Sequence, residues 1–478
     1  MNKDVKEIIA SLNKSPLGDG GSIYFIGIGG IGMSALARYF KAKGVRVSGY
    51  DKTATPLTKQ LADEGIAVHY EDNIEFIDKE ARLVVFTPAV PKDHQELNYF
   101  QQHDYTILKR SDVLGAITSS SFNICVAGTH GKTTTSTMVA HILRHSGYGC
   151  NAFLGGIAVN YNSNFWPQTR DGGNEKNVCV VEADEYDRSF LKLSPDIAII
   201  SSMDPDHLDI YGTAENMEQA FIDFAGKLKP GGLLLSKFGL KRHADLKAGR
   251  HLTYHLQDTN ADVYASDIRM KNGSYQFDMW MDTGELAVGN LQGVLLNMGG
   301  MHNVENALAA ITVALELGID AGKIKNAVAD FRGVKRRFEY IIKNEGQVYI
   351  DDYAHHPEEL RALITGAKAL FADKKCTVVF QPHLFSRTRD LADGFAVSLD
   401  GADEVILLPI YPARELPVEG VNSEMILDKM KNKNKKVLQK EELLDWVKNN
   451  KAELLITAGA GDIDTLVEPI QKILTNKI

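Results

Sequence analysis

Cysteine is scarce in this chain of 478 residues. Its four cysteines, Cys125, Cys150, Cys179 and Cys376, are scattered and form no CxxC pair. This spacing argues against a disulfide framework and a zinc site, and it is typical of a reducing cytoplasm, where we expect the protein to act. Long apolar runs are lacking too, since none approaches the ~18 residues that cross a bilayer, and residues 1–18 contain no apolar core of a signal peptide. We therefore expect no membrane partner.

Basic residues are outnumbered by acidic ones. Lys and Arg total 53 against 62 Asp and Glu, so the net charge is −9 with neutral histidines. Because binding to nucleic acid needs a basic face, we expect no nucleic-acid partner. The contents of 44% hydrophobic and 24% charged residues are those of a globular protein and exclude a mostly disordered or collagen-like chain. We expect a monomer or a weak homodimer.

The chain is too long for one hydrophobic core, because single cores stop growing near ~250–300 residues. Apolar runs alternate with helical segments and glycine-rich turns, a pattern that predicts an α/β fold with parallel sheets. A polar stretch at 118–123 indicates a linker. We predict three domains over residues 1–118, 119–333 and 334–478. The predicted strands are 22–28, 45–50, 83–87, 124–127, 178–181, 197–201, 347–350, 377–381, 404–408 and 453–458.

The first glycine-rich turn, GIGGIG, lies between a predicted strand and a predicted helix and contributes Gly27, Gly29, Gly30 and Gly32. Glycines let a diphosphate approach the backbone, and the helix N-terminus adds a partial positive charge. Asp51 ends the next predicted strand, at the spacing of about 20 residues where a dinucleotide site holds a ribose. Alone, this turn predicts a nicotinamide-dependent dehydrogenase, or a turn that serves only packing.

The second glycine-rich turn follows the predicted strand 124–127 and precedes a predicted helix at 136–146; it comprises Gly128, Thr129, His130, Gly131, Lys132, Thr133 and Thr134. Its backbone amides can surround phosphates, Lys132 can reach the terminal phosphates, and the Thr133 hydroxyl can bind Mg²⁺. It is shorter than the GxxxxGK[ST] pattern, because Val126 stands where that pattern has its first glycine. The turn predicts an ATP site.

The two turns together separate three classes of protein. A dehydrogenase leaves the second turn unexplained, and a non-catalytic nucleotide-binding regulator leaves the acids, histidines and arginines downstream unexplained. An enzyme that uses ATP to activate a nucleotide-linked substrate needs both turns. We therefore favour the enzyme.

Several downstream residues follow predicted strands, where open α/β sheets bind ligands. Glu182 is the preferred Mg²⁺ ligand, and His207 is either a second metal ligand or a helix cap. Arg387 and Arg389 can clamp a carboxylate or a phosphate, or form surface ion pairs. Arg336 and Arg337 share that ambiguity.

Nine segments occur in the order found in the Mur ligases, and the chain resembles that family over nearly its whole length. They are GIGGIGMSALA (27–37), GTHGKTTT (128–135), EADEYDRSF (182–190), MDPDHLDIYG (203–212), MHNVENALAA (301–310), GVKRRFE (333–339), DDYAHHP (351–357), FQPHLFSRTRDL (380–391) and GAGDI (459–463). The resemblance implies a Rossmann-like N-terminal domain for a UDP-sugar, a central P-loop ATPase-like domain with a mostly parallel sheet, and a Rossmann-like C-terminal domain.

The resemblance also implies an activity. It is the ATP-dependent ligation of L-alanine to the lactyl carboxylate of UDP-N-acetylmuramate through an acyl phosphate, a step of peptidoglycan precursor synthesis. The alternative within the family is a ligase that reattaches a recycled muropeptide. The first turn would then hold the UDP diphosphate and not a nicotinamide cofactor.

The resemblance further implies roles for single residues. Lys132 and the loop amides would hold the ATP phosphates, Thr133 and Glu182 one Mg²⁺, and His207 the second. His130 would lie near the lactyl carboxylate and Asn303 near adenine, Arg337 and Asp351 would bring the C-terminal domain onto the nucleotide, and Tyr353, His355 and Arg387 would face L-alanine. His355, or an aspartate beside it, could take the proton of the amine. The chain departs from the family at Leu384, where a basic residue is common.

Overall fold

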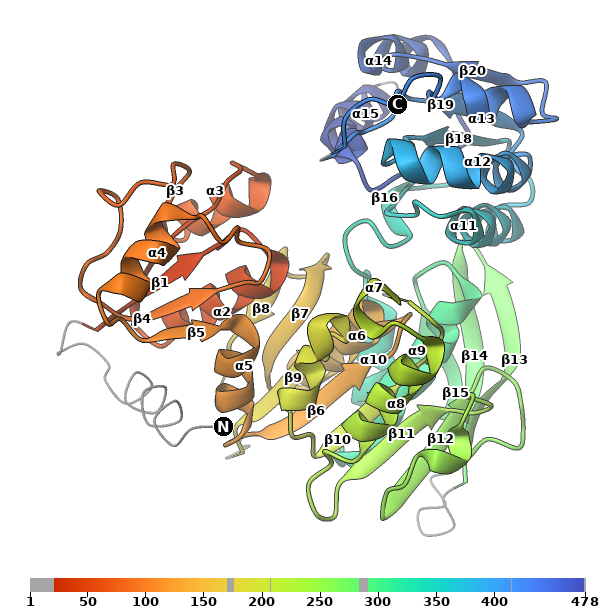
Figure 1. The fold of residues 1–478 in the computed structure, drawn as a ribbon. Helices are drawn as coiled ribbons and strands as arrows, with labels where there is room; N and C mark the ends of the chain where they lie inside the picture. Colours follow the sequence, from red (N-terminus) through yellow and green to blue (C-terminus); the bar gives the residue numbers. More distant parts are fainter. Residues whose placement is uncertain (1–20, 170–175, 207, 283–290, 414, 477–478) are drawn as a thin grey trace. The chain divides into compact units, whose positions relative to one another are not determined.

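The computed structural model describes residues 21–169, 176–206, 208–282, 291–413 and 415–476. It is an α/β structure with three sheets (Figure 1). The described chain forms two compact units, one from within 1–265, 279–291 and 305–327, the other from 266–278, 292–304 and within 328–478. The α/β fold class predicted from the sequence is confirmed.

The N-terminal sheet has five parallel strands in the order β3-β2-β1-β4-β5, a Rossmann-like arrangement. Its strands are β1 (Ser22–Ile26), β2 (Arg46–Tyr50), β3 (Ala67–His69), β4 (Ala81–Phe86) and β5 (Ile107–Lys109). Its helices are α2 (Ile31–Ala42), α3 (Pro56–Asp63), α4 (Gln95–Gln102) and α5 (Arg110–Thr118). Every residue of β1 is buried, as expected of a central parallel strand.

The central sheet has ten strands in the order β15-β14-β13-β12-β11-β10-β6-β9-β7-β8. The ladders from β9 through β6 to β13 are parallel, and β8 pairs antiparallel with β7 at the edge. The strands are β6 (Phe122–Ala127), β7 (Asn151–Ala158), β8 (Ser163–Trp166), β9 (Val178–Glu182), β10 (Ile197–Ile200), β11 (Leu233–Lys237), β12 (Arg250–His255), β13 (Val263–Lys271), β14 (Ser274–Met281) and β15 (Leu291–Leu296). The helices are α6 (Lys132–His145), η1 (Tyr186–Lys192), α7 (Leu208–Tyr211), α8 (Ala214–Ala225), η2 (His243–Asp245), α9 (Met301–Glu316) and α10 (Ala321–Asp330).

The C-terminal sheet has six strands in the order β16-β17-β21-β18-β19-β20, of which β16 is antiparallel and the others are parallel. The strands are β16 (Glu339–Lys343), β17 (Val348–Asp352), β18 (Cys376–Phe380), β19 (Glu404–Leu407), β20 (Lys435–Val437) and β21 (Leu454–Ala458). The helices are α11 (Pro357–Leu370), α12 (Phe385–Leu399), α13 (Glu424–Lys429), α14 (Lys440–Asn449), η3 (Asp462–Leu466) and α15 (Val467–Thr475).

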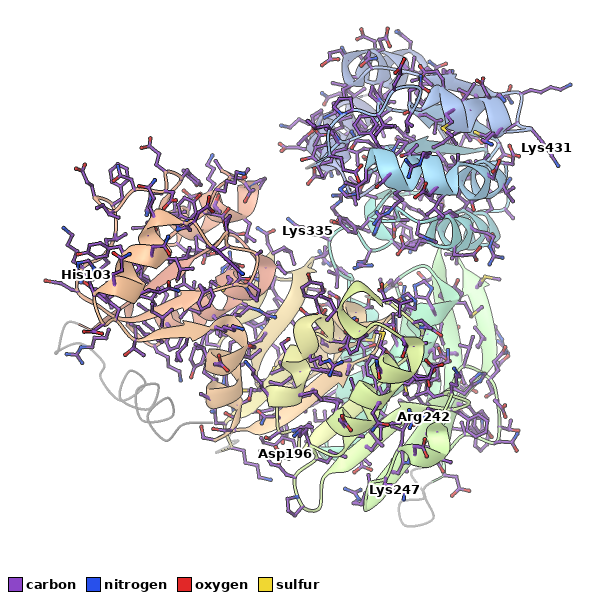
Figure 2. All side chains as sticks on the ribbon, in the orientation of Figure 1. His103, Asp196, Arg242, Lys247, Lys335 and Lys431 are labelled. Atoms are coloured by element: carbon purple, nitrogen blue, oxygen red, sulfur yellow. The ribbon has the colours of Figure 1, made fainter. Side chains whose placement is uncertain are left out.

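Two local predictions differ from the structure. The helix predicted at 136–146 begins four residues earlier, at Lys132, so the end of the second turn is the first turn of α6. The stretch 118–123 is not an extended linker, because α5 continues to Thr118 and β6 already begins at Phe122. Asp196, labelled in Figure 2, fixes this strand by accepting a hydrogen bond from the Asn123 amide at 2.7 Å. The domain boundaries themselves stay predictions, and no described helix is long and apolar enough to span a membrane.

A buried polar network lies inside the N-terminal domain. The Tyr24 hydroxyl donates to Glu96 Oε2 at 2.6 Å and lies 2.6 Å from His69 Nε2, and the Asn73 amide donates to Glu96 Oε1. The Glu96 side chain is fully buried. Burial raises the pKa of Glu96 to about 7, against the opposing effect of the Tyr24 hydrogen bond.

The raised pKa of Glu96 predicts a pH-dependent stability. Because the folded pKa lies above the unfolded value, the stabilisation is full below about pH 4.5 and is lost as pH rises through 7. Glu96→Gln should match the wild type at pH 5 and exceed it by roughly 1–3 kcal/mol at pH 8. Urea unfolding at both pH values measures this difference, with the exposed Glu80→Gln as control. An equal effect of Glu96→Gln at both pH values would contradict it.

Candidate functional site

The first glycine turn is held by the end of β2. The Gly27 and Ile28 amides donate to the Tyr50 carbonyl at 2.8 and 2.9 Å, and the Gly29 amide donates to Asp51 Oδ2 at 2.7 Å. A Cβ at Gly29 would lie 2.6 Å from a methyl of Thr58 and 2.8 Å from Asp51 Oδ2, so a larger residue would force these side chains to shift. Asp51, predicted to hold a ribose, thus fixes the turn itself.

The second glycine turn is held by the end of β10. The His130 amide donates to Ser202 Oγ and the Thr129 hydroxyl donates to the Asp204 carbonyl, both at 2.7 Å. Gly128 has a φ of +135°, and a Cβ there would lie 2.2 Å from Ser201 Oγ. These contacts therefore fix the backbone conformation of the turn, which continues into the N-terminus of α6. The His130 side chain itself points into solvent and is 70% exposed.

Lys132 is surrounded by oxygen atoms of the protein. Its Nζ donates to the carbonyls of Gly128 at 2.6 Å and Thr129 at 3.3 Å, and to Glu185 Oε1 at 2.7 Å. Glu185 is only 1% exposed, and its other carboxylate oxygen has no hydrogen-bond partner among the described residues. Burial raises the pKa of Glu185, and the Lys132 charge opposes that rise. Only Glu182 was predicted as a site residue from the segment EADEYDRSF, so Glu185 as the partner of Lys132 was missed.

Thr133 and Glu182 meet as the resemblance implies for a metal site. The Thr133 hydroxyl donates to Glu182 Oε1 at 2.9 Å, and the Gly155 amide donates to Glu182 Oε2 at 2.8 Å. Burial raises the pKa of Glu182, against the Lys132 charge, so a cation would favour its ionised form. A hydroxyl and a carboxylate are oxygen ligands that Mg²⁺ prefers, so the pair fits this ion. His207 lies outside the described residues.

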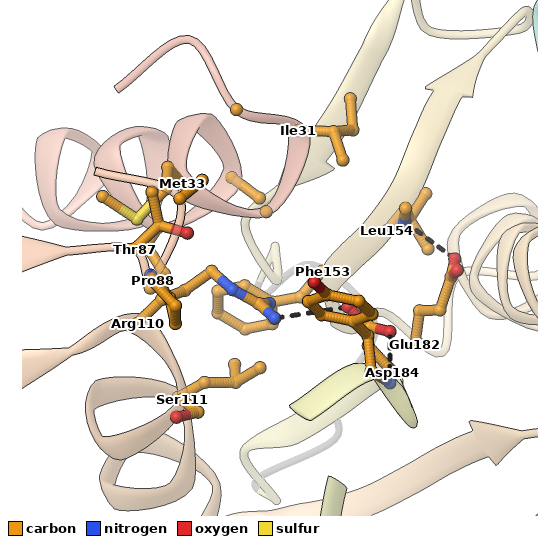
Figure 3. Close-up of a pocket in the computed structure, with 18 residues that line it drawn as sticks. Ile31, Met33, Thr87, Pro88, Arg110, Ser111, Phe153, Leu154, Glu182 and Asp184 are labelled. Carbon is orange, nitrogen blue, oxygen red and sulfur yellow. Dashed lines mark hydrogen bonds and ion pairs between the residues drawn. The ribbon is translucent and has the colours of Figure 1, made fainter. Parts of the chain in front are cut away.

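A cavity of about 460 Å³ connects the first turn with Glu182 (Figure 3). Gly30 to Met33 line one side, and Phe153 to Gly155 of β7 line the other, together with Glu182. The register of the central sheet explains the position of this acid, because Glu182 pairs with Val126, two residues before the second turn begins. The cavity thus extends from the first glycine turn to Glu182, which lies beside the second glycine turn.

Arg110 is a cavity residue that the sequence analysis missed. It begins α5, and a Cβ at Gly32 would lie 2.8 Å from its Nη1 atom. Its Nη2 atom lies 3.5 Å from Asp184 Oδ2, which Figure 3 shows as a dashed line. The guanidinium therefore gives the cavity a positive charge next to the first turn. An arginine directly after a short strand was the available sequence signal.

Three neighbouring strands bring the C-terminal candidates to one sheet edge. Asp352 of β17 and Phe380 of β18 both pair with Ala458 of β21, so the chain segments that follow leave the sheet at one level. Asp351 is buried; it accepts from the Thr457 hydroxyl at 2.6 Å and from Arg336 Nε at 3.2 Å. Burial raises the pKa of Asp351 to about 7, and Arg336 opposes the rise.

The two arginines before β16 take different positions. Arg336, and not Arg337, pairs with Asp351, although both guanidinium groups lie over the Tyr353 ring, at 5.2 Å from its centre for Arg336 and 5.8 Å for Arg337. Asn303, in the same compact unit, is buried in α9 and donates to the Gly299 carbonyl at 2.7 Å.

A histidine pair forms the rest of this C-terminal group. His355 Nδ1 lies 2.9 Å from the Tyr353 carbonyl, its ring centre is 6.4 Å from that of His383, and His383 Nδ1 is 3.5 Å from Arg387 Nη1. Burial lowers the pKa of both histidines, so both are neutral at neutral pH. His383 was not among the predicted site residues, although it stands in the predicted segment.

Leu384 lies directly before α12, and Arg389 lies within it. Leu384 precedes the helix with a φ of +70°, a strained value for leucine, and its amide donates to the Tyr411 carbonyl. Arg389 forms an exposed ion pair with its neighbour Asp390 at 2.8 Å. Of the two readings given for Arg389, the structure shows the surface ion pair.

Family comparisons cover most of the chain. Residues 22–121 match the model for the Mur ligase family, catalytic domain; residues 126–314 match the Mur ligase middle domain; and residues 336–462 match the Mur ligase, glutamate ligase domain. A UDP-N-acetylmuramate–L-alanine ligase of Flavobacterium johnsoniae is 49% identical over 461 residues, which are 96% of this chain and 98% of that protein. The same-named ligase of Flavobacterium psychrophilum is 50% identical over 460 residues, covering 95% and 98%.

Solved structures give the same result. A crystal structure of a UDP-N-acetylmuramate–alanine ligase from Thermotoga maritima superposes with a TM-score of 0.81 at 28% identity, covering 96% of this chain and 100% of that one. A murein peptide ligase from Psychrobacter arcticus shares the fold, with a TM-score of 0.67 at 23% identity and coverage of 96% and 100%. The two glycine turns, the metal-type pair and these similarities agree, and the chain belongs to the Mur ligase family.

Proposed function

We propose that this protein uses ATP to join L-alanine to the lactyl carboxylate of UDP-N-acetylmuramate, in peptidoglycan precursor synthesis. The observation that carries the proposal is the cavity between the first glycine turn and Glu182. A UDP-sugar held by its diphosphate at the first turn can extend a carboxylate toward the second turn. Relatives that are about half identical over nearly their whole length are ligases of this name.

We assign the ligands to three domains, with boundaries near residues 118 and 333. The first turn and Arg110 hold the UDP-sugar, and the amides of the second turn hold the ATP phosphates. Thr133 and Glu182 would hold one Mg²⁺, and His207 a second. When bound, Mg²⁺ neutralises phosphate charge and withdraws electrons from the transferred phosphoryl group.

The chemistry has two steps. The lactyl carboxylate attacks the γ-phosphorus of ATP. The bond between the γ-phosphorus and the β-phosphate oxygen breaks, ADP departs, and the carboxylate becomes an acyl phosphate. The neutral amine of L-alanine then attacks the acyl carbon, loses a proton and expels inorganic phosphate. Lys132 stabilises the negative charge that develops on the phosphoryl oxygens. His355 accepts the amine proton, for which its lowered pKa keeps it unprotonated at neutral pH.

The proposal also covers the cellular compartment and the oligomeric state of the protein. The four cysteines are buried free thiols, which suits a reducing compartment, and we place the protein in the cytoplasm. A monomer or weak homodimer stays our expectation.

Phosphate release tests the proposed reaction. Release from ATP should require UDP-N-acetylmuramate and L-alanine together, and it should stop when either is left out. Replacing alanine with a tripeptide separates the proposed ligase from the related ligase of recycled muropeptides. Release that depends on the tripeptide and not on alanine would reject our assignment.

Lys132→Ala should lower kcat by at least ~100-fold, because it removes the cation that stabilises the transferred phosphoryl group. Binding of UDP-N-acetylmuramate, measured by calorimetry, should stay within a factor of about three of wild type, since the first turn is separate; this retained binding also shows that the variant folds. Turnover within tenfold of the wild type would contradict the role of Lys132.

Arg110→Ala should raise KM for UDP-N-acetylmuramate by roughly 10–100-fold, the loss expected for one charge-assisted hydrogen bond. KM for ATP should change little, because the contacts described for Arg110 are with the first turn and Asp184 and not with the second turn. Arg110→Lys, which keeps the charge, should recover part of the loss. Steady-state kinetics with each substrate varied in turn measures both effects, and an equal rise in both KM values would refute the assignment.

A further inference from the structure

Helix α2 packs against the hairpin formed by β7 and β8, at the edge of the central sheet (Figure 1). We call this contact the α2–β8 joint; it comprises Ser34, Arg38 and Tyr39 of α2 and Phe153, Asn164 and Phe165 of the hairpin. It lies within one compact unit, and it joins the helix that follows the first glycine turn to the sheet that carries the second.

Asn164 supplies the polar centre of the joint. Its Nδ2 donates to the Ile31 carbonyl at 2.5 Å and to Ser34 Oγ at 3.0 Å, and its Oδ1 accepts from the Arg38 guanidinium. Arg38 in turn forms two hydrogen bonds of 2.8 Å with Glu64, through Nε and Nη2. Asn164 and Ser34 are fully buried. Since both ends of the carboxamide are bonded to α2, a shift of the helix along β8 would break buried hydrogen bonds.

Aromatic packing connects the joint to the cavity. The Tyr39 ring lies 5.4 Å from the ring of Phe153 and 6.0 Å from that of Phe165, and all three are almost fully buried. Within the joint, Phe153 therefore forms part of the cavity wall, whereas Asn164 is not among the residues that line it.

We propose that Asn164 is a positioning residue for the ligase reaction. It fixes α2, and with it the first glycine turn, at a set distance from Glu182 and the second turn. A substrate held by its diphosphate at one turn must present its carboxylate at the other, and a misplacement of about 1 Å can cost a factor of ~100 in rate. The inference rests on the proposed function, because it assumes that one substrate spans both turns.

Asn164→Ala tests the inference against a matched control, Asn151→Ala. Asn151 is a buried asparagine of β7 whose hydrogen bonds stay inside the central domain, with Asn177, Val178 and Gln168. Both variants should lower the melting temperature to a similar extent. Only Asn164→Ala should lower kcat/KM for UDP-N-acetylmuramate, by at least tenfold, and the Kd for ADP should stay within twofold of wild type in both.

Ser34→Ala keeps the test available if Asn164→Ala does not fold. It removes one acceptor of Asn164 Nδ2 and should shift kcat/KM for the UDP-sugar in the same direction by a smaller factor. Kinetics of the folded Asn164 or Ser34 variant equal to those of Asn151→Ala would overturn the inference, as would an equal loss of ADP affinity. A wild-type protein without alanine-dependent phosphate release would instead reject the proposed function.

Discussion

The ion pair between Lys132 and buried Glu185 is the interaction on which the site depends. Two carboxylates, half-buried Glu182 and buried Glu185, stand three residues apart, on β9 and the loop after it. Burial raises the pKa of both, and the Lys132 charge opposes that rise at each. A buried charge without a partner costs several kcal/mol. The lysine therefore favours the ionised form of both acids, while its own ammonium lies at the turn that we propose to receive phosphate.

The second constraint is the spacing of the two glycine turns. Each turn is rigid by itself, because Asp51 and the Tyr50 carbonyl hold the first, and Ser202 and the Asp204 carbonyl hold the second. Buried side chains of the N-terminal and central sheets form one continuous apolar cluster, which includes Phe25, Phe153 and Val181. Two rigid turns on one shared core can act on the two ends of a single substrate.

The sequence was enough to predict those parts of the fold and site that depend on residues next to each other in the chain. A buried strand, a glycine turn and a helix follow each other directly in the chain, so both turns could be found. The Thr133–Glu182 pair, whose members are 49 residues apart, was implied by the family resemblance. The sequence could not reveal that Lys132 pairs with Glu185, because acidic runs are usually solvated and burial depends on tertiary packing. Nor could it place Arg336 on Asp351 or Asn164 on Ser34, which is 130 residues away. Such contacts depend on how elements far apart in the chain pack.

The transfer of oxygen from substrate to phosphate tests the central claim most directly. UDP-N-acetylmuramate labelled with ¹⁸O in its lactyl carboxylate is turned over with ATP and L-alanine, and the released phosphate is examined by mass spectrometry. If the carboxylate is activated by phosphorylation, each phosphate carries one ¹⁸O atom from the sugar. Phosphate without the label would contradict an acyl phosphate and, with it, the account of two phosphate turns that act on one substrate.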